Sequence, residues 1–171
     1  DNGYITVYLN HYNDATLIDN LSKIKDFKFE VFSKEIQLPY QLNNIKFLPI
    51  NKDVFNHSLI NCHGIITGAG FETPAEALYL GKKLMVFPLN GQYEQQCNAK
   101  ALEEFNAVSL KGFDEYFPTH FENWISDDKK YTLGINNSTD EIIREVINQG
   151  INLKSVNKKM QEYTPNLEIA I

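Results

Sequence analysis

The sequence has few of the features that mark secreted, membrane-spanning or nucleic-acid-binding proteins. Its 171 residues include two cysteines, Cys62 and Cys97, which form no CxxC or Cys/His zinc pattern, so we expect neither a disulfide framework nor a metal site. No apolar run approaches the ~18 residues that span a bilayer, and the first residues do not resemble a signal peptide. Basic residues number 16 against 22 acidic ones, which argues against nucleic acid as a partner. We therefore expect a cytoplasmic protein without a transmembrane segment.

The rest of the composition is that of a folded domain. Hydrophobic residues make up 43% of the chain and charged residues 22%, a balance typical of globular proteins. The chain opens directly on a strand pattern with no methionine or leader before it, so we expect a piece of a longer protein. Residues 1–150 are expected to form one compact domain, and residues 151–171 a polar tail or a terminal helix.

Hydrophobic periodicity alternates between strand and helix along most of the chain. Short β-branched or apolar runs predict strands, and apolar residues at three- and four-residue spacing predict helices. The expected strands cover residues 4–9, 28–32, 45–49, 64–67, 83–88 and 107–110, and the expected helices cover residues 17–24, with Asp14 as a cap, 53–60, 73–80, 95–105 and 139–149. This alternation predicts an α/β fold, a doubly wound parallel sheet with helices on both faces, which binds ligands beyond the carboxyl ends of its strands.

A glycine turn leads from the expected strand over residues 64–67 into a helix. Residues 68–76 read GAGFETPAE. Glycines let an anion approach the backbone closely, and the N–H groups and dipole at a helix start bind a diphosphate without a metal. Glu76 would then lie within reach of a ribose. The residues from Thr73 to Glu76 also form a capping box with proline at the first helical position, so a purely structural interpretation is open.

A second polar helix start follows the next strand. Residues 88–99 read PLNGQYEQQCNA and contain Glu94 and Gln95, a carboxylate acceptor beside an amide that both donates and accepts hydrogen bonds. Sugar hydroxyls are bound by such a mixture. A solvated helix N-terminus with glutamate near its positive end would account for the same residues without a ligand.

Together the two segments resemble the C-terminal domain of GT-B-fold glycosyltransferases, the donor-binding half of a two-domain protein. The similarity is clearest over residues 64–99 and weaker over residues 4–112. It is strongest to the bacterial peptidoglycan lipid-intermediate N-acetylglucosaminyltransferases and extends more distantly to the UDP-glycosyltransferases. The donor-binding residues that this resemblance implies are Ile50 for the base, Gly70 and Thr73 for the diphosphate, Glu76 for the ribose, and Glu94 and Gln95 for the sugar. Gly68, Phe71 and Asn98 are expected to bind the donor beside them.

The resemblance implies a chain that binds UDP-sugar and forms the C-terminal half of a hexosyl-transferring enzyme. The acceptor domain and the catalytic base would lie in an N-terminal partner domain, so no catalytic residue is assigned here and the isolated chain is expected to bind without turnover. No Asp-x-Asp motif is present, so we expect neither a metal nor another cofactor. Peripheral membrane association of the whole protein stays open.

Two departures from the family pattern keep alternatives open. Many relatives have a glycine-rich loop after the first strand, whereas this chain has Asn10-His11-Tyr12-Asn13, and the basic residue often found near the phosphates has no clear counterpart. His11 could supply a phosphate contact or simply be solvated. The alternative functions are half of a UDP-sugar 2-epimerase, whose Gly-Gly-x-x-Glu-Glu pattern fits residues 68–73 poorly, and a noncatalytic nucleotide-sugar-binding module.

Overall fold

The protein is described here by a computed structural model, which covers residues 2–129, 131 and 138–162, with residues 152–162 described by their backbone only. Contacts divide the chain into two units, Asp1–Leu133 and Gly134–Ile171. The first unit holds all seven strands of one sheet, in the order β3-β4-β2-β1-β5-β6-β7. The second holds α6 (Thr139–Glu162).

Strands and helices alternate along the first unit, as the periodicity predicts. The strands are β1 (Tyr4–Tyr8), β2 (Lys28–Ser33), β3 (Tyr40–Leu42), β4 (Ile45–Pro49), β5 (Gly64–Gly68), β6 (Lys83–Phe87) and β7 (Val108–Ser109). The helices are α1 (Asp14–Leu21), α2 (Lys52–Asn61), α3 (Glu72–Tyr79), α4 (Tyr93–Glu103) and α5 (Phe117–Ser126). All strand pairs are parallel except β3 with β4. The predicted α/β fold is confirmed.

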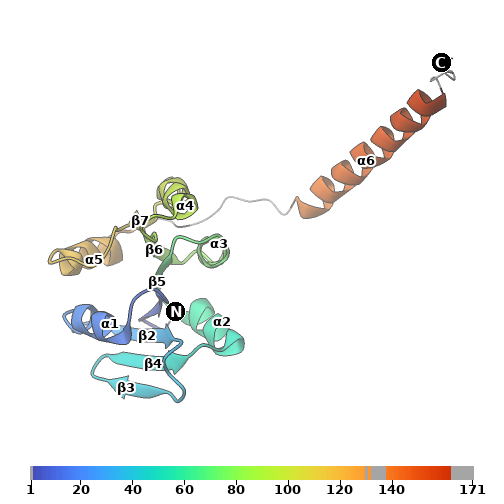
Figure 1. Ribbon diagram of the computed structural model, residues 1–171. Coiled ribbons are helices and arrows are strands. Elements are labelled where there is room, and N and C mark those ends of the chain that lie inside the picture. The colour runs from blue at the N-terminus through green and yellow to red at the C-terminus, as the bar shows by residue number, and fades with distance from the viewer. Residues whose placement is uncertain (1, 130, 132–137, 163–171) are drawn as a thin grey trace, which may run out of the picture. The chain divides into compact units, whose positions relative to one another are not determined.

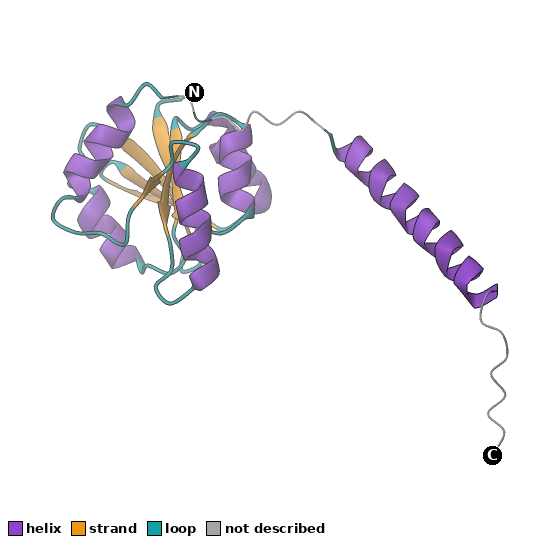
Figure 2. Ribbon diagram, turned by 90° about the horizontal axis from the view of Figure 1, so that it is seen from above, coloured by secondary structure: helices purple, strands orange, loops and turns teal. Residues whose placement is uncertain are grey.

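Helices cover both faces of the sheet. α1 and α5 lie on one face and α2 and α3 on the other (Figure 1), and the view from above shows the strands enclosed between helices (Figure 2). The central strands are therefore apolar on both faces. In β5, Ile65 and Ile66 point to opposite faces and both are fully buried, which is why residues 64–67 form a continuous apolar run rather than an alternating one.

The first helix begins one residue earlier than its predicted cap implies. Asp14 is the first residue of α1, and Asn13 is the N-cap: its side-chain Oδ1 accepts a hydrogen bond from the backbone N–H of Thr16 at 2.8 Å. Asparagine and aspartate are equally good caps. Composition alone therefore could not choose between the two neighbours, and the expectation that Asp14 caps the helix is wrong.

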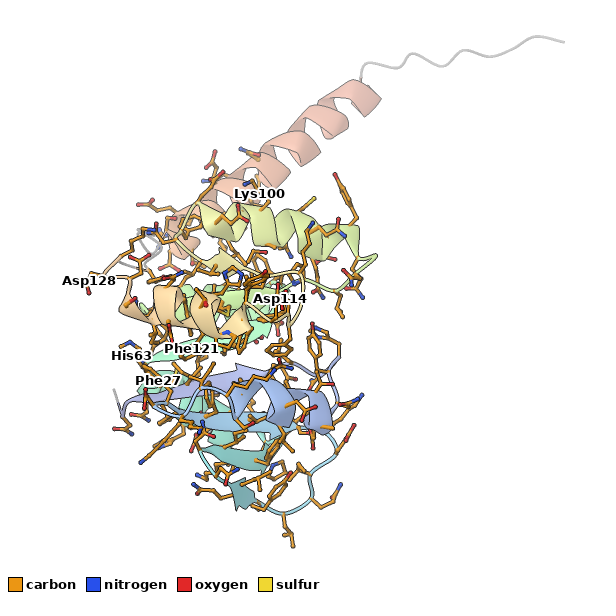
Figure 3. The ribbon with its side chains drawn as sticks, turned by 90° about the vertical axis from the view of Figure 1, so that its left-hand side faces the viewer. Phe27, His63, Lys100, Asp114, Phe121 and Asp128 are labelled. Carbon is orange, nitrogen blue, oxygen red and sulfur yellow. The ribbon has the colours of Figure 1, made fainter. Side chains whose placement is uncertain are left out.

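Sequence periodicity missed one strand and one helix. The edge strand β3 is exposed along its whole length, so it carries no alternating burial pattern to detect. Helix α5 does bury one side: Phe117, Phe121 and Trp124 pack into the core, and Phe121 lies beside Phe27, with ring centroids 5.2 Å apart (Figure 3). The spacing of these aromatic residues is helical, and that signal was present in the sequence.

The last helix is longer than the predicted span of residues 139–149. α6 continues through residue 150, where the sequence-based domain boundary was drawn, to Glu162. That boundary stays a prediction. Among the described helices, none is long and apolar enough to cross a membrane.

The amino-terminal ends of the central strands are tied to the rest of the first unit by lysines. Lys82 donates from Nζ to the backbone carbonyls of Ile60 at 2.6 Å and Cys62 at 2.9 Å. Lys83 reaches the carbonyl of Trp124 at 3.2 Å and also that of Asp127, at the end of α5. Helix ends leave carbonyls without intrahelical partners, so these bonds satisfy orphan acceptors and anchor α2 and α5 to the sheet.

Candidate functional site

A cleft of about 370 Å³ opens at the carboxyl ends of β1 and β5. β1 pairs with β2 on one side and with β5 on the other, so the chain order of the sheet reverses at this point. Ligands of open α/β sheets bind at such a switch point, beyond the strand ends. The cleft is lined on one side by Tyr8, Asn10 and His11, and on the other by the glycine turn and the first turn of α3.

The glycine turn leads into a helix whose start has no side-chain cap. α3 begins at Glu72, its N-cap is Phe71, and no side chain accepts a hydrogen bond from its first turn. Thr73 is thus the second helical residue and lines the cleft. The capping-box interpretation is therefore wrong, since its threonine would have to precede the helix. The first backbone N–H groups of α3 and the positive end of its dipole remain available to an anion.

Gly70 leaves room that no neighbouring protein atom fills. A Cβ built on Gly70 would meet nothing within 4 Å, and its φ is not positive. Neither packing nor backbone strain therefore requires glycine at this position. A glycine in such open space leaves the backbone accessible to close approach by another molecule. Gly68, one residue before Ala69, also lines the cleft.

The amide side chains predicted to bind sugar also hold the loops together. Gln95 accepts a hydrogen bond at Oε1 from the backbone N–H of Leu89 at 3.0 Å and donates from Nε2 to Gln92 at 2.9 Å. Asn98 donates from Nδ2 to the carbonyl of Ala69 at 3.2 Å. Gln95 thus shapes the loop after β6, and Asn98 ties α4 to the glycine turn.

The structure brings five of the nine predicted site residues into one cleft. These are Gly68, Gly70, Phe71, Thr73 and Gln95. Four others lie outside its lining. Ile50 follows β4, and Glu76 lies in the second turn of α3. Glu94 lies in the first turn of α4, and Asn98 of the same helix donates to the glycine turn. Their assignments to base, ribose and sugar stay predictions.

The loop after β1 lies outside the predicted donor-binding residues, and its His11 was predicted only as a phosphate contact or a solvated side chain. Tyr8 ends β1 and is paired in register with Thr67 of β5, so the residues after it lie beside the glycine turn. The His11 ring packs on Tyr12 with centroids 4.5 Å apart, and Tyr12 packs on Phe113 at 5.0 Å. The position of this loop directly after a central strand was the sequence feature that could have placed it at the site.

Charge in the cleft is sparse and mostly negative. Of the described residues that line it, Glu72 carries a carboxylate and none is a lysine or arginine. Partial desolvation lowers the pKa of His11 below its usual value, so the ring is neutral near pH 7 in the empty protein. Across the described residues, no cluster of three His, Cys, Asp or Glu side chains could hold a metal ion.

A mostly parallel sheet covered by helices, with a cleft beside an uncapped glycine turn at its switch point, defines a Rossmann-like domain of the kind found in GT-B proteins. The sequence model of glycosyl transferase family 1 matches residues 1–125. The chain belongs to glycosyl transferase family 1. No curated protein matches the sequence.

Solved glycosyltransferases share the fold. The chain is similar to the glycosyltransferase SnogD from Streptomyces nogalater, with 19% identity and a TM-score of 0.56 over 73% of this chain. It is also similar to the spinosyn forosaminyltransferase SpnP, with 14% identity and a TM-score of 0.54 over 74% of this chain. In each case the similarity covers 35% of the other protein, so the chain spans about a third of the length of these glycosyltransferases. The fold is consistent with a GT-B C-terminal domain.

Proposed function

We propose that this chain binds the diphosphate of a UDP-sugar in the cleft between β1 and β5, as the donor-binding half of a hexosyltransferase. The observation that carries the proposal is the glycine turn at Gly70 immediately before the start of α3. Among the described residues no side chain caps the helix start, and a Cβ on Gly70 would meet no atom within 4 Å apart from its chain neighbours. A helix N-terminus of this kind is a ready anion site.

The other donor contacts follow from their places around the diphosphate. Thr73 lines the cleft and offers its hydroxyl to a phosphate oxygen. Glu76 is exposed in the next turn of α3 and bears a carboxylate that accepts from ribose hydroxyls. Glu94 lies at the start of α4 and is assigned to the sugar, and the exposed Ile50 after β4 is assigned to the base.

The proposed role is donor binding rather than complete catalysis. Transfer requires a base that takes the proton of the acceptor hydroxyl and groups that stabilise the departing diphosphate. The start of α3 serves the second requirement. The acceptor site and the base are assigned to another domain of the whole protein. This assignment agrees with the comparisons, in which the chain matches only about a third of the length of SnogD and of SpnP. The isolated chain therefore binds donor and does not turn it over.

Calorimetric titration of the folded chain with UDP tests the proposal. We expect a dissociation constant in the range of about 10 µM to 1 mM, because one open cleft buries only part of the nucleotide. EDTA should leave binding unchanged, since the helix dipole and N–H groups serve in place of a metal. Loss of binding in EDTA and its return with manganese would contradict this placement of the phosphates.

Two variants test whether UDP binds in the cleft: one changes a residue of the cleft, and the other is a surface control. Gly70→Val places a branched side chain in the cleft and should abolish measurable UDP binding. Ala101→Val changes an exposed residue of α4 and should bind UDP like the unchanged protein. Absence of both heat and thermal shift at millimolar UDP in the unchanged, folded protein would refute the proposed function.

A further inference from the structure

The cleft lacks a fixed positive charge opposite the proposed diphosphate. A nucleotide sugar brings two phosphate charges, and Glu72 adds a carboxylate to the same cleft. Among the described lining residues, His11 alone has a side chain that can become cationic near neutral pH. We propose that His11 binds the donor diphosphate as an imidazolium and makes donor binding coupled to proton uptake. This inference rests on the proposed function and assigns that site its cationic contact.

The fold places His11 beside the phosphate site. β1 and β5 are neighbours, with Tyr8 paired to Thr67, so the loop after β1 and the glycine turn leave the sheet side by side. His11 and Gly70 line the same cleft. The imidazole therefore approaches the anion from the wall opposite α3, and the two together hold it between a helix dipole and a side-chain charge.

The His11 ring rests on an aromatic support. It packs on Tyr12 with centroids 4.5 Å apart, and Tyr12 packs edge-on against Phe113 at 5.0 Å and Phe87 at 6.1 Å. Phe87 ends β6 and is fully buried. A ring packed on the half-buried Tyr12 loses less side-chain entropy when it binds a ligand than a free surface histidine does.

Among the described residues that line the cleft, Glu72 has the one carboxylate that could face an imidazolium. The charged groups on the elements around the loop are Glu72 on α3, Asp14 on α1, Lys34 and Glu35 after β2, and Lys111 before Gly112. Partial burial of the ring lowers the pKa of His11. A bound diphosphate would thus be the charge that stabilises the protonated ring.

The sign of the pH dependence follows by linkage. The His11 pKa is below its usual value in the empty protein and is raised by the anion in the complex. Between these two values, binding takes up a proton. Affinity is then highest at low pH, where the ring is already protonated, and falls as pH rises through the pKa of the complex.

The test uses the β-methyl ester of UDP as its probe. Esterification keeps the charge of the diphosphate constant, whereas the terminal phosphate of UDP itself titrates with a pKa of about 6. Calorimetry of the whole chain should show affinity falling roughly tenfold or more from about pH 5.5 to about pH 8.5. At intermediate pH, titrations in buffers of different ionisation enthalpy should show proton uptake on binding.

Three variants assign the effect to one residue. His11→Gln should bind weakly with a nearly flat pH profile, and His11→Lys should bind with a flat profile and no loss at high pH, because lysine stays charged there. His57→Gln changes an exposed histidine of α2 and should keep the full pH dependence. A flat profile in the unchanged protein, or a pH dependence retained in His11→Gln, would overturn the inference while leaving UDP binding intact. Failure of the ester to bind at any pH would overturn the proposed function and the inference together.

Discussion

At the amino-terminal ends of the central strands, polar side chains are bonded to other parts of the chain. Tyr4 donates its hydroxyl hydrogen bond to the carbonyl of Ser58 at 3.0 Å, and Lys82 and Lys83 each bind two backbone carbonyls. Beyond the carboxyl ends of the same strands, in α3, the side chains of Thr73 and Glu76 make no hydrogen bond or ion pair with the described part of the chain. The first edge uses its polar side chains for the fold. At the second edge the amides of Gln95 and Asn98 bond to neighbouring loops, and the side chains of Thr73 and Glu76 stay available.

Glycine follows the same division. A Cβ on Gly64, at the amino end of β5, would lie 2.9 Å from Lys83 Cβ and 3.0 Å from both the Lys83 carbonyl oxygen and Trp124 Cη2. A Cβ on Gly70 would meet nothing within 4 Å. Two residues of the same type thus differ in their surroundings: Gly64 permits close packing, and Gly70 borders open space in the cleft. The edges can therefore be perturbed separately.

The largest expected effect is on stability at the packed edge. Gly64→Ala should lower the free energy of unfolding by roughly 3 kcal/mol, because the backbone and Cβ of Lys83 cannot move aside as a flexible side chain would. Gly70→Ala should change it by less than about 0.5 kcal/mol and should weaken UDP binding instead. Urea unfolding and calorimetry measure the two quantities. Equal stability losses in the two variants would remove the contrast between the edges.

The second effect is a loss of UDP affinity at the carboxyl-end edge with no change in the free energy of unfolding. Glu76→Gln should leave unfolding unchanged, since no capping box depends on the carboxylate. UDP affinity should fall by roughly 1.5 to 3 kcal/mol, the range for a hydrogen bond to a charged group. Calorimetry on the folded variant provides the measurement. An affinity equal to that of the unchanged protein would remove Glu76 from the ribose site.

The smallest effect distinguishes Glu94 from its neighbour Gln95, whose side chain is hydrogen-bonded to the loop after β6. Glu94→Ala should weaken binding of a UDP-sugar by about 1 kcal/mol or more and leave UDP unchanged. Gln95→Ala should weaken both ligands and lower stability by about 1 kcal/mol, because the Leu89 N–H loses its acceptor. Paired titrations with UDP and UDP-glucose check both expectations. If both variants weakened UDP equally, Glu94 would belong to the loop rather than to the sugar site.

The sequence by itself determined the class of fold and the glycine turn that leads into a helix. Short sequence patterns predict both features. One is an apolar run buried on both faces, such as residues 64–67, and the other is a glycine turn followed by a helix. Most predicted strands and helices match the observed ones to within two residues. The exact helix starts were less certain, because Asn13 and Asp14 are equivalent caps and the residues from Thr73 to Glu76 fit a cap that α3 does not use.

Tertiary structure alone decided which residues share the cleft. No local pattern states that β1 lies beside β5, and this pairing brings His11 to the glycine turn. Nor does sequence reveal that Gln95 and Asn98 turn their amides toward backbone groups of neighbouring loops. The order of strands arises from the packing of helices on both faces of the sheet, a property of the whole chain. A site assembled from the ends of two strands 60 residues apart in sequence, Tyr8 and Gly68, therefore becomes visible only once the sheet is formed.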